Sequence, residues 1–346
     1  FELSFREKIA LFCNVDPDCV IENRDCESVY ELPLLFEREG FGNVVCKKLG
    51  IAKDRVPDLS DWETLIARYR AAARKIPVAL VGKYVVLRDA YLSVSEALTH
   101  AGIAYDSEID IRWVNAEDLE RSDPESLLGG VAAILVPGGF GPRGMEGMVV
   151  AAGYARKNHI PFLGIGLGMQ MAVVEYARNV AGIAGAHSGE CENECQRLFY
   201  LPAPNDALRP SSDGGFNSAN GGGIAGATLS IDEKYMRRGA YSSDTLSGSR
   251  VREAYGAERV SERHHHRWEF DNRFRPALEQ AGMVFSGVDG QDNGRVDMVE
   301  LADHPWFVGT IAHPEFKSRP TRPHPLFSAL VKAAVAYATP RPSATH

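Results

Sequence analysis

The chain has no long hydrophobic run and no excess of basic residues. Its apolar stretches, such as residues 131–136, are far shorter than the roughly 18 to 20 residues that a membrane-spanning helix needs, and no signal-peptide core precedes them. Lys and Arg number 38 against 46 Asp and Glu, a net charge of −8. A membrane span and a broad nucleic-acid surface are therefore not expected, and we predict a cytoplasmic protein.

Cysteine is also sparse, and its spacing is uninformative. None of the six cysteines forms a C-x-x-C pair, so the pattern indicates neither a zinc ribbon nor a disulfide framework. Three consecutive histidines, at residues 264–266, suggest a metal tract at first sight. Adjacent side chains diverge in strands and helices, and no second Cys or His group stands nearby in the sequence, so we expect no metal site.

Three segments are expected along the 346 residues. Residues 1–40, with a strand at 9–14 and a helix at 29–39, are too short to enclose a core and are interpreted as the end of a domain that is otherwise missing. Residues 41–75, which include a polar helix at 62–75, are predicted to be a linker. Residues 76–340 are expected to form the main domain, with a surface loop at 203–227 that is rich in Gly, Ser and Asn.

The main domain is predicted to be α/β and three-layered, with a mostly parallel central sheet and helices on both faces, because short apolar runs alternate with amphipathic segments. Strands are expected at 78–82, 109–114, 131–136, 162–165, 284–288, 296–301 and 307–312, and helices at 90–101, 145–158, 167–179 and 326–337, with order resuming at 251–255 after the loop.

The segment GIGLG, at residues 164–168, places a glycine frame between a strand and a helix. In a nucleophile elbow the central residue of such a frame is held in a strained turn beside a helix N-terminus. Here that residue is Gly166, which has no nucleophilic atom. A dinucleotide site with Glu190 as the ribose acid is disfavoured because Met169 and Met171 stand where a small residue is required. Tight structural packing is the remaining interpretation.

A second glycine loop, PGGFGPRG at residues 137–144, also follows a predicted buried strand. Consecutive glycines let the backbone approach a ligand and turn an N–H group toward a negative charge. In an open α/β sheet, neighbouring strands that both end in glycine loops mark the ligand crevice. We therefore expect residues 138–141 and 164–168 to lie together.

The remaining candidates are charged. His313 and Glu315 follow the last predicted strand, and Pro314 favours an extended chain in which residues two apart project to one side, as in a base and its orienting carboxylate. Arg267 offers a fork for a carboxylate, and Glu190 an acceptor for an amino group. Together these two residues suit a zwitterionic amino-acid substrate.

In this order, the motifs resemble those of class I (triad-type) glutamine amidotransferases and, among them, the glutaminase portion of CTP synthases. The resemblance covers nearly the whole chain, and residues 1–40 resemble the end of the family's amidoligase domain. The matching motifs include VGKY (81–84), ILVPGGFG (134–141), PFLGIGLGMQ (161–170), ERHHHRWEF (262–270) and HPWFVGTIAHPEF (304–316).

The resemblance implies roles for these residues. His313 and Glu315 match the catalytic base and its partner, and Gly139 and Leu167 match the residues whose backbone N–H groups face the oxyanion. L-Glutamine is the implied substrate. The substrate-binding set that it implies is Gly139, Leu167, Gly168, Met169, Gln170, Glu190 and Arg267.

It also implies a partner domain. ATP, UTP and Mg are expected in the amidoligase domain and no cofactor in this one, with GTP as an allosteric activator and a homotetramer formed through the missing domain. The family's arginine between the histidines of its RHRHR block is His265 here, and its GGTMRLG segment survives only loosely at 226–229.

Position 166 is where the family carries its nucleophilic cysteine. Because a covalent route needs such an atom, we expect this chain to be inactive in glutamine hydrolysis. Three explanations remain open: a deliberate substitution that traps intact glutamine, a natural loss that leaves a glutamine-binding or interaction module, or a chemically altered cysteine. We favour the first, because His313, Glu315 and the surrounding positions are retained.

Overall fold

The computed structural model describes residues 3–52, 56–191, 196–200, 236–290 and 294–339. Its centre is a nine-stranded sheet in the order β2-β1-β3-β4-β12-β11-β10-β7-β8. The loop predicted at 203–227 lies outside the described residues. The strands are β1 (Arg74–Gly82), β2 (Ser107–Asn115), β3 (Ala133–Val136), β4 (Phe162–Ile165), β7 (Arg237–Thr245), β8 (Arg259–His266), β10 (Met283–Asp289), β11 (Arg295–Leu301) and β12 (Phe307–Thr310).

The sheet has a parallel half and an antiparallel half. Strands β2, β1, β3, β4 and β12 are mutually parallel, and β11, β10, β7 and β8 extend the sheet with antiparallel pairs. The predicted α/β class is therefore confirmed, and the parallel strands form one half of the central sheet. The polar strands β7 and β8 were not predicted, because their apolar content is low and only alternate side chains of β8 are buried.

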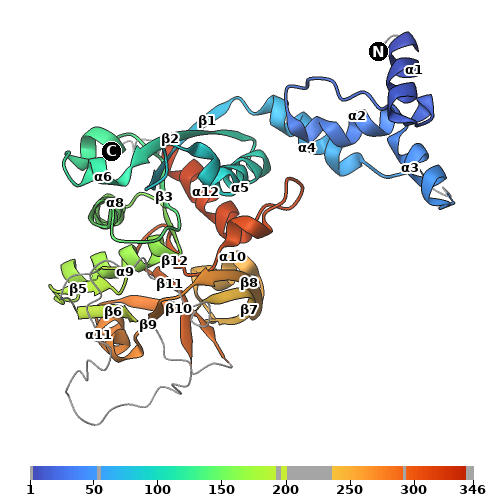
Figure 1. Cartoon of the computed structure of the whole chain (residues 1–346). Helices are drawn as coiled ribbons and strands as arrows, with labels where there is room; N and C mark the ends of the chain where they lie inside the picture. The colour runs from blue at the N-terminus through green and yellow to red at the C-terminus, as the bar shows by residue number, and fades with distance from the viewer. Residues whose placement is uncertain (1–2, 53–55, 192–195, 201–235, 291–293, 340–346) are drawn as a thin grey trace, which may run out of the picture.

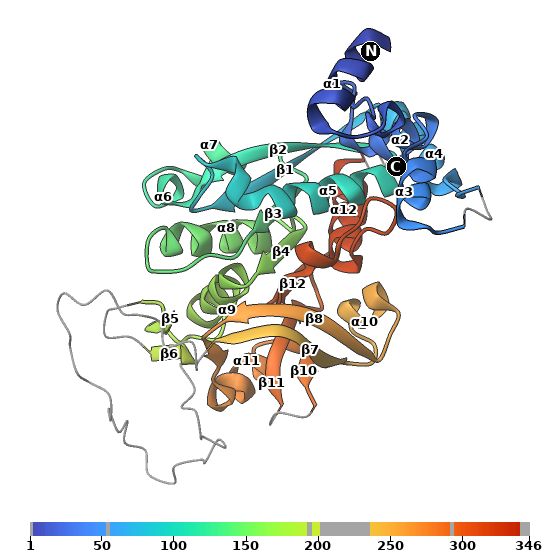
Figure 2. The same cartoon turned by 45° about the vertical axis from the view of Figure 1, so that its right-hand side comes forward.

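Helices cover both faces of the parallel half (Figures 1 and 2). On β1, Ile76, Val78 and Leu80 pack with α5 (Leu92–Ala104) and α12 (Pro325–Ala338), whereas Ala79 and Val81 pack with α8 (Met145–Lys157) and α9 (Leu167–Asn179). Because successive side chains of a strand point to opposite faces, a strand buried on both sides is apolar throughout. The three-layer prediction is confirmed by this arrangement.

Smaller elements complete the main domain. The second sheet has the order β5-β6-β9 and lies near α9 and α11. None of the helices in the described part of the chain combines the length and the apolar character that a bilayer crossing requires. The bounds are β5 (Ala186–Ser188), β6 (Gln196–Tyr200), β9 (Glu269–Phe270), α6 (Ala116–Leu119), α7 (Pro124–Leu128), α10 (Arg250–Tyr255) and α11 (Arg275–Gln280).

The N-terminal segment is helical and stands away from the sheet (Figure 1). It contains α1 (Leu3–Cys13), α2 (Leu32–Arg38), α3 (Phe41–Leu49) and α4 (Ser60–Ala71). The strand predicted at 9–14 is wrong: these residues end α1, since a short apolar run preceded by helix-forming residues is ambiguous by periodicity alone. The helix predicted at 62–75 ends earlier, at Ala71, because Arg74 already begins β1.

Candidate active site

The two glycine loops lie at the same edge of the sheet. Strands β3 and β4 are adjacent and parallel, so the residues that follow them emerge side by side. A Cβ atom built on Gly166 would lie 3.4 Å from the Cα atom of Gly138. The turn after β4 therefore touches the turn after β3, as the sequence predicts.

Gly166 has a backbone conformation that side chains rarely adopt. Its φ and ψ angles are 56° and −113°, and it directly precedes α9. The glycines beside it are required by packing, because a Cβ on Gly168 would lie 2.0 Å from the carbonyl oxygen of Val136, and one on Gly164 would lie 2.7 Å from that of Gly168. The glycine frame therefore combines a strained turn with a close approach of α9 to β3.

His313 and Glu315 face this turn from β12, which is parallel to β4. The Nδ1 atom of His313 lies 2.7 Å from Oε1 of Glu315. A Cβ atom on Gly166 would lie 3.7 Å from Nε2 of His313, so the imidazole reaches the position that a side chain at 166 would occupy. Glu315 lies in a 3-10 turn (Pro314–Lys317), not in the extended chain that was predicted, but it still meets the imidazole.

The surroundings of His313 favour its protonated form. Burial, the largest single influence, lowers the pKa of His313, but the hydrogen bond with Glu315 and the charge of that carboxylate outweigh it. The net result is a pKa raised above the ordinary value of 6.5. The ring can therefore hold a proton next to the turn at 166, as a general acid must.

Glu190 and Arg267 lie on the other side of the same cavity and are paired with each other. Arg267 donates to both carboxylate oxygens of Glu190, from Nε at 3.2 Å and from Nη2 at 3.0 Å. The indole Nε1 of Trp268 donates to Oε1 at 2.6 Å, and the backbone N–H of Gly141 donates to Oε2 at 2.7 Å. A buried acid and a cation thus face the cavity with their positions set by several donors.

Gln170 lines the cavity together with Glu190 and Arg267. Its Oε1 accepts a hydrogen bond of 2.5 Å from the hydroxyl of Ser188, which also accepts from the backbone N–H of Glu190 at 3.2 Å. Ser188 was not predicted, and its only sequence signal is its place two residues before Glu190. It links the first turn of α9 to the segment that carries Glu190.

Most of the predicted residues line one cavity, but Glu315, Gly168 and Met169 do not, and Glu315 reaches the cavity only through its hydrogen bond with His313. Gly168 packs on Val136, and Met169 is fully buried, with its side chain against Gly309 in the core, so only their backbone N–H groups belong to the helix start at the site. The cavity is lined by Gly138, Gly139, Phe140, Gly166, Leu167, Gln170, Glu190, His265, His266, Arg267, Trp268 and His313.

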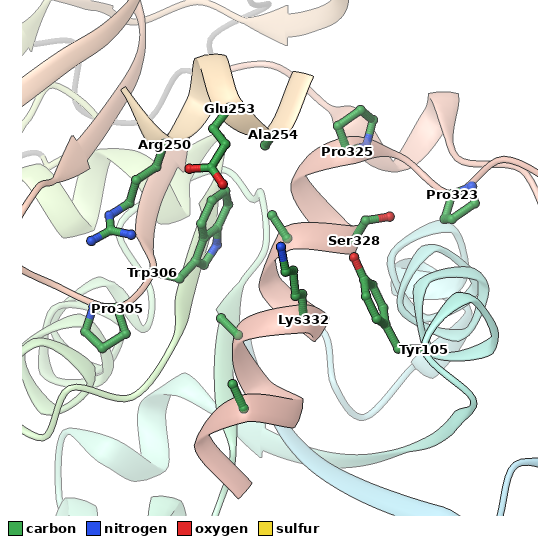
Figure 3. A pocket seen from close by; sticks show the side chains of 13 residues that line it. Tyr105, Arg250, Glu253, Ala254, Pro305, Trp306, Pro323, Pro325, Ser328 and Lys332 are labelled. Atoms are coloured by element: carbon green, nitrogen blue, oxygen red, sulfur yellow. The ribbon is translucent and has the colours of Figure 1, made fainter. Parts of the chain in front are cut away.

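Another cavity lies between α10 and α12 (Figure 3). Trp306, Tyr105 and several prolines line it, with Arg250, Glu253 and Lys332 around them. It has no described lining residue in common with the cavity of the glycine loops.

Comparison with known proteins identifies the family. The model of the family "Glutamine amidotransferase class-I" matches residues 86–333. The chain belongs to this family. A second model, "CTP synthase N-terminus", matches residues 1–51. The glutaminase domain of Trypanosoma brucei CTPS, solved with bound acivicin, is similar in structure, with a TM-score of 0.63 and 31% identity over 77% of this chain and 96% of that one.

The relatives within the amidotransferase family are CTP synthases. Those of Ruminiclostridium cellulolyticum and Pyrococcus furiosus are each 46% identical, over 96% and 97% of this chain and 58% of their own lengths. The chain thus spans about 58% of these relatives. The amidotransferase part of the chain corresponds to the glutaminase domain of a CTP synthase.

Proposed function

We propose that the cavity of the glycine loops binds L-glutamine, and that the same site with cysteine at position 166 hydrolyses it to glutamate and ammonia. The observation that supports this most strongly is the meeting of Gly166, His313 and the Glu190–Arg267 pair in one cavity. The name of the family to which the chain belongs, glutamine amidotransferase class I, supports glutamine as the ligand.

The charges suit the two ends of an amino acid. In the structure Arg267 and Glu190 neutralise each other. Glutamine carries an ammonium and a carboxylate, so in the proposed complex the ammonium joins Glu190 and the carboxylate takes donors from Arg267. The side-chain amide then points toward Gly166. In this exchange the Glu190 carboxylate replaces its bonds from Arg267 with bonds from the ligand ammonium. A nearly buried carboxylate thus stays hydrogen-bonded before and after binding.

The backbone beside the proposed position of the glutamine side-chain amide offers donors for an oxyanion. The first N–H groups of α9 have no partner within the helix, and Gly139 lies beside Leu167: a Cβ on Gly139 would be 3.7 Å from Cδ2 of Leu167. We assign the N–H groups of Gly139 and Leu167 to the developing negative charge on the amide oxygen.

The chemistry requires an atom that Gly166 lacks. With cysteine there, His313 takes the thiol proton and the thiolate bonds to the amide carbon; the C–N bond then breaks as His313 gives that proton to the departing ammonia. Water next attacks the thioester carbon while His313 takes a proton from it, the C–S bond breaks, and glutamate leaves with the thiolate restored. Without the sulfur the covalent route is closed, so we propose that this chain holds glutamine without turning it over.

For the whole protein we propose the CTP synthase reaction. Ammonia released at this site by the form with cysteine at position 166 would aminate UTP at the expense of ATP in an amidoligase domain of the same protein, with Mg bound there and GTP as activator. This proposal includes a homotetramer, and it rests on the relatives named above.

Substituting Gly166→Cys tests the proposed activity. We expect the variant to release ammonia from glutamine several orders of magnitude faster than the original chain, since loss of a nucleophile removes that much rate. Its Cβ meets only ordinary contacts, at 3.4 Å or more, but the positive φ angle should cost about 1–3 kcal/mol of stability. Ammonia release and a urea denaturation curve measure the two effects.

Gly166→Ala is the matched control, because it carries the same strain without a sulfur. It should lose similar stability and stay inactive. A folded Gly166→Cys variant that binds glutamine but releases no ammonia would contradict the proposed chemistry. If the native gene also encodes glycine at this position, the chain is a natural glutamine-binding module, which is the second candidate.

A further inference from the structure

Lys83 is a buried cation that the proposed chemistry does not use. It follows β1, and only 3% of its surface is exposed. Its ammonium group donates to the carbonyl oxygens of Phe140, at 3.2 Å, and Gly141, which belong to the loop after β3. Burying an ammonium group is costly unless it is hydrogen-bonded, so these two carbonyls are part of what keeps Lys83 in place.

One peptide unit of the loop is held at both ends. Between Phe140 and Gly141, the carbonyl oxygen accepts from Lys83 and the N–H donates to Glu190 at 2.7 Å. The peptide dipole therefore lies between a cation and an anion, each at the end that it stabilises. In a glycine-rich loop, where rotation of a peptide unit is easy, such a pair of contacts selects one orientation.

The stem of Lys83 supports the neighbouring glycine. A Cβ atom on Gly139 would lie 3.4 Å from Cδ of Lys83, so the methylene groups pack directly against this backbone. The N–H of Gly139 is one of the two donors that we assign to the oxyanion. Lys83 thus touches the loop at the glycine that faces the reaction and at the two carbonyls that follow it.

We propose that Lys83 is a positioning residue that fixes the glycine loop, and with it the N–H of Gly139, for stabilisation of the oxyanion. This inference rests on the proposed function for its catalytic consequence, but the fixing of the loop is independent of catalysis. Lys83 touches no assigned substrate atom and acts through the backbone.

Because the proposed fixing of the loop needs the charged form of Lys83, it should depend on pH. Burial lowers the pKa of Lys83 to about 8, Arg143 also lowers it, and Glu190, Glu117 and Glu120 oppose this shift. The charged form that holds the loop is therefore present below about pH 8 and is lost above it. Proposed catalysis should fall as the pH rises through this value.

The test uses Lys83→Met in the full chain, with Lys75→Met as control. Lys75 lies on β1, the strand that Lys83 follows, but its side chain is 68% exposed. In the Gly166 chain, Lys83→Met should speed amide hydrogen exchange of Gly141 tenfold or more, and Lys75→Met should leave it unchanged. In the Gly166→Cys background, Lys83→Met should lower kcat by one to two orders of magnitude with little change in KM, and should remove the decline near pH 8.

Each outcome separates the two proposals. Unchanged exchange and unchanged kcat in Lys83→Met would overturn the positioning role, and so would a rise in KM alone, since that would place Lys83 in substrate binding. If Gly166→Cys releases no ammonia, the proposed function fails, and the exchange rate of Gly141 still decides whether Lys83 fixes the loop. Should Lys83→Met not fold, Lys83→Gln, whose side chain is one atom shorter but keeps a donor group, is expected to give intermediate exchange and kcat.

Discussion

Gly166 and Glu315 show how single residues shape this site. At 166 a φ angle of 56° suits glycine, so the absence of a side chain relieves strain that a cysteine would carry. At 315 a carboxylate, 8% exposed, holds Nδ1 of His313, while Nε2 lies 3.7 Å from the position of a Cβ atom on Gly166. The tight turn and the oriented imidazole therefore lie together beside a residue that has no side chain.

Glu315→Gln should lower the pKa of His313, because burial would then act without the carboxylate that opposes it. A pKa raised by folding stabilises the protein below the ordinary value of 6.5, and that contribution is lost as the pH rises through the raised value. The variant should therefore lose stability mainly at acid pH. An NMR titration of the His313 ring measures its pKa, and denaturation curves at pH 5 and pH 8.5 measure the change in stability. An unchanged pKa would contradict the role of Glu315 in raising it.

At the scale of elements, α8 and α9 are joined by an ion pair as well as by their apolar faces. Arg156 donates to both oxygens of Glu175, at 2.8 and 2.7 Å, and Glu175 is 1% exposed. The helices approach closely there, since a Cβ on Gly153 would lie 2.9 Å from Oε1 of Glu175. Because α9 begins directly after Gly166, the contacts that fix α9 in place also fix the turn at 166.

Arg156→Ala should destabilise the fold by about 3–5 kcal/mol, because it leaves a buried carboxylate without its cation. Arg275→Ala, which removes the partially exposed partner of Glu279, is the control and should cost less than about 1 kcal/mol. Urea denaturation of both variants provides the comparison. Equal losses would mean that the buried pair adds nothing specific to the packing of α8 on α9.

For the whole molecule, the N-terminal helices and the main domain are joined by a small contact. Tyr30, Leu65 and Ile103 form a separate buried cluster, and the hydroxyl of Tyr30 donates to Glu96 at 2.5 Å. The large apolar clusters lie on the two faces of the central sheet. Most of the free energy of unfolding should therefore come from the main domain. The domain boundaries predicted at residues 40 and 75 remain predictions, which a deletion can test.

Removing residues 1–72 should leave a chain that unfolds cooperatively. The lost contacts are few, so we expect the midpoint of thermal unfolding to fall by no more than about 10 °C and glutamine affinity to stay within a factor of about two. Circular dichroism melting and calorimetric titration measure these quantities. A broad, non-cooperative transition would show that the N-terminal helices belong to the same folding unit.

The sequence by itself determined the local features: the apolar strands of the parallel half, the helices on both faces, the glycine turns and the histidine with its acid. The strands and helices follow from the periodicity of the apolar residues. The glycine turns and the histidine with its acid follow from residue types that suit few other local structures. Only the tertiary structure decided that Glu190 and Arg267 pair with each other, that Ser188 and Trp268 join the site, and that Lys83 reaches the glycine loop. Such contacts join segments distant along the chain, and their geometry depends on how the strands are ordered in the sheet.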